Sequence, residues 1–134
     1  MKLAQLLSVY PQLKWGSFAH KEVHSLCRDS RKVQSGDLYI AIRGEQKDGH
    51  DYLPEVCEKG ILGVVVEDDR NIPDHFQGAV VEVSNSRQAL DLLASRFYGE
   101  PAQNLFCVGV TGTNGKTSTT YMIEAVLNQL GWPT

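Results

Sequence analysis

The feature that most constrains this chain is a glycine-rich turn between an apolar segment and a helical pattern. The turn reads GVTGTNGKT over residues 109–117, and it follows the apolar residues 105–110, which we predict to form a strand. Behind it, apolar residues recur at helical spacing: Ile123, Val126, Leu127 and Leu130. A strand, a glycine-rich turn ending in Gly-Lys-Thr and a helix, in this order, predict a phosphate-binding loop.

Each residue type in this turn has a chemical use. Glycines let backbone N–H groups converge on a polyphosphate, and the helix amino terminus adds partial positive charge. Lys116 can reach the β and γ phosphates of a nucleotide, and the Thr117 hydroxyl can bind Mg²⁺. The general pattern has a glycine where this chain has Val110. An ordinary glycine turn that caps a helix is therefore the alternative.

Composition limits the class of protein. The chain has 134 residues, 42% of them hydrophobic, which is enough for one full domain. Its net charge of -3 and the lack of a basic run argue against a nucleic-acid partner. The apolar stretches are too short for a membrane span or a signal peptide, so we expect a cytoplasmic protein. Three cysteines without a CxxC pair indicate reduced thiols.

Residues 1–98 have the pattern of a small α/β domain. Apolar runs predict strands, and apolar residues at helical spacing predict helices. The predicted strands are 23–26, 38–42, 64–66 and 79–83, and the predicted helices are 3–10, 53–57 and 85–97. Residues 99–104 are polar and broken by glycine and proline, so we predict a linker there.

Residues 105–134 then begin a second domain with one strand and one helix. Such a unit cannot cover both faces of a sheet, so we expect this domain to be incomplete. The apolar face of its helix then lacks partners. Three outcomes stay open: the helix frays, folds back on the first domain, or pairs with another copy in a dimer or swapped association.

Three weaker signals lie in the first domain. The DSR sequence at 29–31 suits recognition of a phosphate or carboxylate, with a plain turn as the alternative. For DGH at 48–50 we favour a helix-capping loop over a general base. Glu67 and Asp68 follow an apolar strand, as the magnesium-binding acid of nucleotide hydrolases does, but they precede the phosphate loop. We therefore predict a solvated strand end there.

Five motifs in this order resemble the Mur ligase family, the ATP-dependent enzymes that build peptidoglycan precursors. They are DSR at 29–31, GDLYIAIRG at 36–44, DGHD at 48–51, FYGEP at 97–101 and the turn at 109–117. The resemblance covers nearly all of the chain. The last two motifs are most similar to the branch of the family that adds a diamino acid, and a MurF-type ligase is the alternative.

The resemblance implies a fold and a set of site residues. It implies a UDP-binding α/β domain at 1–98, and the first strand, P-loop and helix of a parallel-sheet ATPase domain from 105 onward. By motif position, the residues along UDP are Arg28, Ser30, Glu45, Gln46 and Lys47. The residues that hold the phosphates of ATP are Gly112, Thr113, Asn114, Gly115, Lys116, Thr117 and Ser118. Lys116 is then the catalytic residue, and Thr117 holds Mg²⁺.

The implied reaction adds a diamino acid, meso-diaminopimelate rather than L-lysine, to UDP-N-acetylmuramoyl-L-alanyl-D-glutamate. An oxide is a poor leaving group, so ATP first converts the D-glutamyl carboxylate to an acyl phosphate, which the amine then attacks. Lys116 and Mg²⁺ neutralise charge on the transferred phosphoryl group. We expect the 134 residues alone to be inactive. A free-standing UDP-sugar-binding module without catalysis is the alternative.

Overall fold

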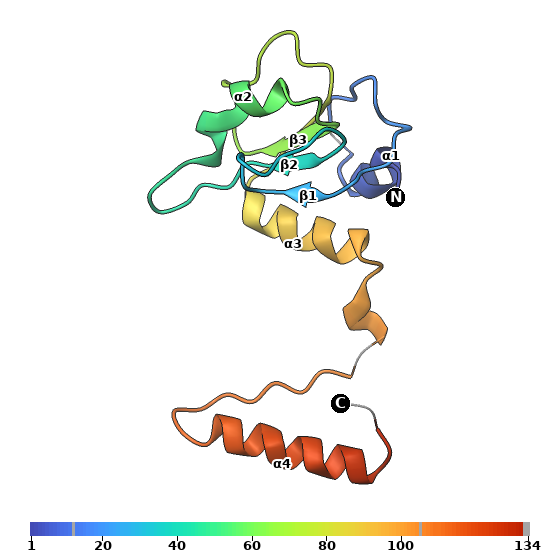
Figure 1. Cartoon of the computed structure of the whole chain (residues 1–134), viewed down its shortest axis with the longest axis vertical. Helices are drawn as coiled ribbons and strands as arrows, with labels where there is room; N and C mark the ends of the chain where they lie inside the picture. The colour runs from blue at the N-terminus through green and yellow to red at the C-terminus, as the bar shows by residue number, and fades with distance from the viewer. Residues whose placement is uncertain (12, 105, 133–134) are drawn as a thin grey trace. The chain divides into compact units, whose positions relative to one another are not determined.

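The computed structural model describes residues 1–11, 13–104 and 106–132. It divides the chain into two compact units, Met1–Pro101 and Ala102–Thr134 (Figure 1). Each unit is described by itself. No helix in the described ranges combines the length and the apolar character needed to cross a membrane.

A parallel sheet of four strands forms the centre of the first unit (Figure 1). The strands lie side by side in chain order: β1 (Leu26–Cys27), β2 (Leu38–Ile40), β3 (Gly63–Val66) and β4 (Ala79–Glu82). This arrangement confirms the predicted α/β class. The first strand begins later than the predicted 23–26, because the Val23 N–H pairs with the carbonyl of Met1 and not with the sheet.

Helices cover both faces of this sheet (Figure 1). One face packs against α2 (Leu53–Cys57), which follows the 3₁₀ turn η2 (Gly49–Tyr52). The other face packs against α1 (Leu3–Leu6), the 3₁₀ turn η1 (Leu7–Val9) and α3 (Ser86–Phe97). The predicted helices of this unit are therefore confirmed.

Side chains of β2 alternate between two apolar clusters, as a strand with two covered faces requires. Leu38 and Ile40 join the cluster of α1 and α3, whereas Tyr39 joins the cluster of α2. All three side chains are at most 1% exposed. The sheet is thus a buried layer, and its strand ends supply the residues that remain accessible.

The start of α3 has the cap that its sequence predicts. The Asn85 side chain accepts hydrogen bonds from the backbone N–H groups of Arg87 and Gln88. These bonds satisfy donors that lack partners within the helix.

The second unit contains the 3₁₀ turn η3 (Pro101–Asn104), which begins in the first unit, and α4 (Lys116–Gln129). The predicted helix is confirmed. The predicted strand at 105–110 is wrong over residues 106–110, which the structure leaves without strand pairing, and residue 105 lies outside the described residues. A strand needs a hydrogen-bonded neighbour, and the described part of this unit supplies none.

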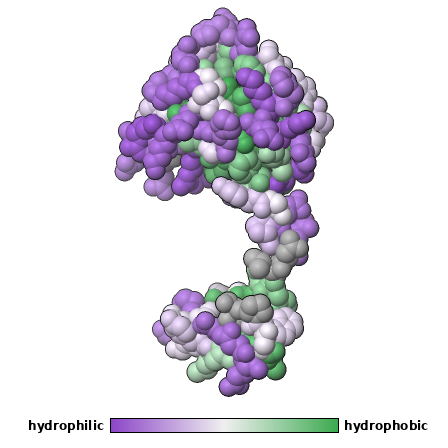
Figure 2. Space-filling view, turned by 45° about the vertical axis from the view of Figure 1, so that its right-hand side comes forward, coloured by the Kyte–Doolittle hydropathy of each residue, from purple (hydrophilic) through white to green (hydrophobic). Residues whose placement is uncertain are grey.

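Apolar side chains of the second unit lie on its surface, where Figure 2 shows hydrophobic colour beside hydrophilic colour. Ile123 and Leu127 are half-buried in a small groove that Val108 and Val110 also line. Other large apolar side chains are at least half exposed: Phe106, Tyr121, Met122, Val126, Leu130 and Trp132.

Candidate functional site

A cavity of about 410 Å³ lies where β1 and β2 end. Ligands of open α/β sheets bind beyond the carboxyl ends of the strands, so this is the expected place for a site. The residues that line it come from two loops, the strand β2 and the 3₁₀ turn η2: Arg28, Asp29, Ser30, Arg31, Tyr39, Ile42, Lys47, Gly49 and Tyr52. The cavity brings together three residues predicted to contact UDP, namely Arg28, Ser30 and Lys47.

The loop after β1 is a turn closed by its own ion pair. The Asp29 carboxylate accepts from Nε of Arg31 at 2.9 Å, from its Nη2 at 2.8 Å and from its backbone N–H at 3.1 Å. These bonds lower the pKa of Asp29 to about 2. The plain turn considered for DSR is therefore present, and its residues also line the cavity.

Ser30 is the most deeply placed residue of this turn, at 9% exposure. Its carbonyl accepts a hydrogen bond of 2.8 Å from Nζ of Lys59, which also pairs with Glu55 on α2. A lysine in the turn that follows α2 thus fixes the loop after β1. The Ser30 hydroxyl has no protein partner within the described residues, so it is free to bind a ligand.

The other residues predicted to contact UDP, Glu45, Gln46 and Lys47, lie on a narrow loop. The Gly44 N–H donates to the carbonyl of Lys47 at 2.9 Å, and Arg43 forms a β-bridge with Asp48. Lys47 reaches the cavity from this loop. Glu45 and Gln46 are exposed at its tip and are not among the residues that line the cavity.

The cavity also has an apolar wall, whose residues were not among the predicted site residues. Tyr39, Ile42 and Tyr52 line it, and the Tyr39 hydroxyl donates to the carbonyl of Gly49 at 3.1 Å. Burial raises the pKa of Tyr39 to about 12, so its hydroxyl stays protonated and remains a donor. The available signal was the position of Tyr39 in the GDLYIAIRG motif, which was interpreted as a buried strand and as one of the five family motifs.

Charge and surface chemistry make this cavity suitable for an anion with an apolar part. Arg28 and Lys47 bring two cations, and the one carboxylate of the lining, Asp29, is paired with Arg31. Guanidinium and ammonium groups bind phosphate oxygens through charge-assisted hydrogen bonds. The ring of Tyr52, which is half-buried, offers a flat surface for a planar ring.

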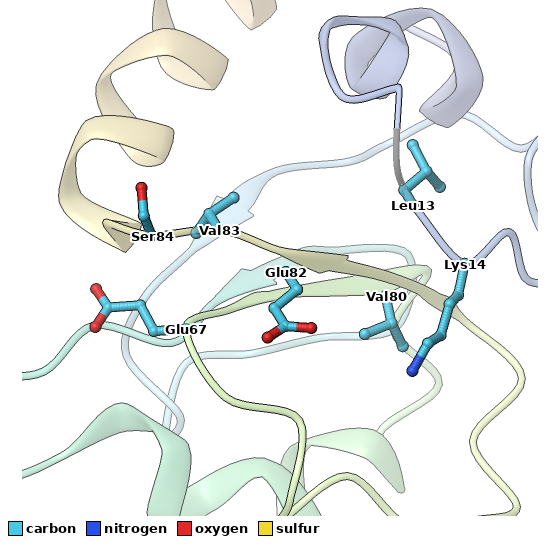
Figure 3. A pocket seen from close by; sticks show the side chains of 7 residues that line it. All are labelled: Leu13, Lys14, Glu67, Val80, Glu82, Val83 and Ser84. Atoms are coloured by element: carbon cyan, nitrogen blue, oxygen red, sulfur yellow. The ribbon is translucent and has the colours of Figure 1, made fainter.

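A larger cavity, of about 690 Å³, lies beside β4 (Figure 3). Val80 and Glu82 extend from that strand, and Glu67 lies near the end of β3 (Figure 3). Lys14 borders the cavity, but its ammonium pairs with Asp69 at 3.0 Å. Because the two glutamates repel anions, this cavity does not suit a phosphate ligand.

The glycine-rich turn of the second unit leads directly into α4. Gly112 and Gly115 have φ angles of +151° and +76°, which only glycine adopts without strain. Nζ of Lys116 donates to the carbonyl of Gly112 at 2.6 Å. Thr113, Asn114, Thr117 and Ser118 are exposed around the start of the helix. The loop therefore presents a lysine, two glycines and hydroxyl groups at a helix amino terminus.

The weaker motifs have structural partners. Asp48 caps η2 by accepting the His50 backbone N–H at 2.9 Å, as the capping interpretation predicts. Glu67 accepts two hydrogen bonds from Ser86, and Asp68 pairs with Arg70, which lowers the pKa of Asp68 to about 2. These partners support a structural strand end over a magnesium site.

Two family descriptions match the chain. "Mur ligase family, catalytic domain" matches residues 22–98, and "Mur ligase middle domain" matches residues 110–134. The chain is 38% identical over 133 residues to the UDP-N-acetylmuramoyl-L-alanyl-D-glutamate--2,6-diaminopimelate ligase of Geobacter sulfurreducens. It is 41% identical over 133 residues to the ligase of the same name from Geobacter metallireducens. Both matches cover 99% of this chain and 26% of the relative, so the chain spans about a quarter of the length of these relatives.

Solved structures with a similar fold include MurF from Acinetobacter baumannii. That match has a TM-score of 0.65 and 28% identity, and it covers 96% of this chain and 27% of the other. The MurF ligase of Thermotoga maritima in complex with ADP matches with a TM-score of 0.54 and 28% identity, over 78% of this chain and 23% of the other.

Proposed function

Because the chain belongs to the Mur ligase family, we propose that it is the amino-terminal part of a MurE-type ligase. The enzyme adds a diamino acid to UDP-N-acetylmuramoyl-L-alanyl-D-glutamate, in the cytoplasm and as a step of peptidoglycan synthesis. The observation that carries the proposal is a basic cavity at Ser30 and a Gly-Lys-Thr helix start in one chain. The names of the relatives, which give 2,6-diaminopimelate as the amino acid, favour diaminopimelate over L-lysine.

The first unit binds the UDP end of the substrate. Arg28 and Lys47 neutralise the pyrophosphate, and the Ser30 hydroxyl donates to or accepts from the nucleotide. Glu45 and Gln46 contact the part of the ligand that extends beyond the cavity, because they stand on the same loop as Lys47. The apolar wall contacts the planar base.

The second unit binds the phosphates of ATP through residues 112–118. The residues present fit this role, because among the described residues Lys116 donates only to a backbone carbonyl, which a phosphate oxygen can replace. The exposed Thr117 hydroxyl is placed to hold Mg²⁺ at the start of α4. When bound, ATP supplies the phosphoryl group that makes the substrate carboxylate reactive. Lys116 then neutralises charge on that group, which is an electrostatic contribution to catalysis.

Titration calorimetry with the substrate and with ATP tests the proposal. We expect saturable binding of UDP-N-acetylmuramoyl dipeptide, which Arg28→Ala and Lys47→Ala each weaken by about tenfold, since each removes a charged contact. Lys21→Ala is the matched control, because this exposed lysine does not line the cavity. Absence of UDP-substrate binding by the unaltered chain would overturn the proposal.

A second measurement separates the ligase from the alternatives. Lys116→Ala should abolish ATP binding by the chain and amide formation by the full-length enzyme. We expect no amide formation from these 134 residues alone, since they span only a quarter of the relatives. Binding of UDP substrate without any binding of ATP favours the free-standing module. Amide formation with D-alanyl-D-alanine in place of a diamino acid favours a MurF-type ligase, the class named in the similar structures.

A further inference from the structure

A buried histidine follows the loop of residues 43–48, which carries Lys47, and it takes no part in the proposed chemistry. His50 is 4% exposed and follows Lys47 by three residues. Its Nδ1 lies 2.6 Å from Oδ1 of Asp48, and its Nε2 lies 2.9 Å from the backbone nitrogen of Glu67. A backbone N–H can only donate, so Nε2 is the acceptor and the ring proton is on Nδ1, which donates to Asp48.

Both nitrogens of the ring are therefore occupied by the protein, and His50 acts through its neighbours. Oδ2 of Asp48 lies 3.4 Å from Nε of Arg43, and the same Nε lies 3.5 Å from Oε2 of Glu67. The Arg43 carbonyl accepts from Nη2 of Arg87 on α3 at 3.1 Å. Both ends of the 43–48 loop are thus tied to the ends of β3 and α3.

The chain beyond this loop is also held from the cavity side. The Tyr39 hydroxyl donates to the carbonyl of Gly49, which lies between Asp48 and His50. Gly49 approaches the neighbouring strand end so closely that a side-chain carbon there would lie 2.7 Å from the backbone nitrogen of Ile42. Residues 47–50 are therefore fixed between Tyr39 on one side and the His50 ring on the other.

We propose that His50 is a positioning residue for substrate binding: its two ring hydrogen bonds hold Lys47 at the edge of the cavity. This inference rests on the proposed function, because it assigns to His50 the placement of a UDP-binding side chain. It differs from a purely structural role, which would lower the stability of the first unit without changing the affinity of the folded protein for a nucleotide.

The test is a double-mutant cycle on UDP binding by the 134-residue chain, measured by calorimetry well below the unfolding temperature of every variant. We expect His50→Ala to raise the Kd for UDP by about tenfold. The binding free energy lost when Lys47 is no longer held in position is then about that of one hydrogen bond. In the Lys47→Ala background the same change should have little effect, because the side chain that His50 positions is already absent. His75→Ala is the matched control, since His75 is exposed and pairs only with Glu58 among the described residues.

Each outcome separates the two proposals. If the unaltered chain does not bind UDP, the proposed function is overturned. If it binds UDP and His50→Ala binds equally well, or if the two changes are additive, the positioning role is overturned. Should His50→Ala fail to fold, His50→Gln replaces it, because the amide oxygen still accepts from the Glu67 N–H while the bond to Asp48 is lost. We then expect a smaller rise in Kd that again disappears when Lys47 is alanine.

Discussion

Glu67→Ala should destabilise the first unit more than any other single glutamate change on its sheet. Oε1 of Glu67 accepts from the backbone N–H of Ser86 at 2.8 Å and from its hydroxyl at 2.9 Å. Ser86 is fully buried at the first position of α3, so removal of the carboxylate leaves two buried donors without an acceptor.

The size of this effect follows from the two bonds. A hydrogen bond to a charged group contributes about 1.5–3 kcal/mol, so the pair contributes about 3–6 kcal/mol. The Glu67 side chain is 20% exposed, so water can enter after truncation and accept hydrogen bonds from Ser86. These bonds recover part of the lost free energy. We therefore expect a loss of about 3 kcal/mol, or a fall in Tm of roughly 12 °C for a unit of this size.

Urea unfolding followed by circular dichroism at neutral pH measures the change. Glu67→Gln is the conservative variant, because its amide oxygen still accepts both bonds, and we expect a loss of about 1 kcal/mol. Glu82→Ala, on the exposed end of β4, should change stability by less than about 0.5 kcal/mol. If Glu67→Ala is no less stable than Glu82→Ala, the reasoning from the Ser86 bonds is refuted.

The stability difference between the natural chain and Glu67→Gln depends on pH, because the Glu67 carboxylate can be protonated. The backbone bond from Ser86 is the main cause that lowers the pKa of Glu67 below its ordinary 4.5. A carboxylate with a lowered pKa in the folded state stabilises above its ordinary pKa, and this contribution is lost as the pH falls through the folded value. The advantage of the natural residue over Glu67→Gln should therefore be complete at neutral pH and shrink below 4.5.

Three further predictions concern other residues of the chain. Burial raises the pKa of Cys57 to about 11, so a thiol reagent at mildly alkaline pH should label the exposed Cys107 and leave Cys57 unlabelled. Equal labelling of the two cysteines in a peptide mass map contradicts this prediction. The bonds from Arg31 hold the pKa of Asp29 at about 2, so the stabilising pair persists below the ordinary 3.8 and is lost as the pH falls through 2. A carboxyl titration of Asp29 by NMR with a midpoint near 3.8 contradicts it. Gly36 has a φ of +90° and lies against the ring of His24, so Gly36→Ala should lower the unfolding free energy by about 1–3 kcal/mol. A denaturation midpoint equal to that of the natural chain contradicts this prediction.

Much of the first unit could be predicted from its sequence because local patterns and tertiary packing agree there. The run at 38–42 is apolar on both faces, and the structure buries β2 on both faces. Asn85 precedes an apolar helical pattern, and it caps α3. In such places the residues that favour an element also supply its contacts.

The strand predicted at 105–110 shows that an apolar run alone does not determine strand pairing. Apolar composition indicates that residues need burial, but hydrogen bonding to a neighbouring strand is a property of two segments. The helix that follows is predicted correctly because its hydrogen bonds lie within one segment, α4. Local bonding can be deduced from a local pattern, whereas pairing depends on residues elsewhere.

The candidate site was predictable in part for a similar reason. Motif position indicated Arg28, Ser30 and Lys47, and the structure places all three around one cavity. Tyr39 and Tyr52 were not among the predicted site residues; they come from a strand and from the turn before α2. Residues from separate elements come into contact only once the chain has folded, and a local sequence pattern does not indicate such contacts.

The chain order of the strands also has a kinetic consequence. Each strand pairs with the strand that follows it in the chain, so the sheet can grow from one edge as the polypeptide is synthesised. The amino-terminal segment makes its last contacts later, because Lys14 pairs with Val80 on the last strand and Gln5 and Ser8 accept bonds from Arg96 on α3. We therefore expect the amino-terminal segment to complete its docking only after α3 has left the ribosome.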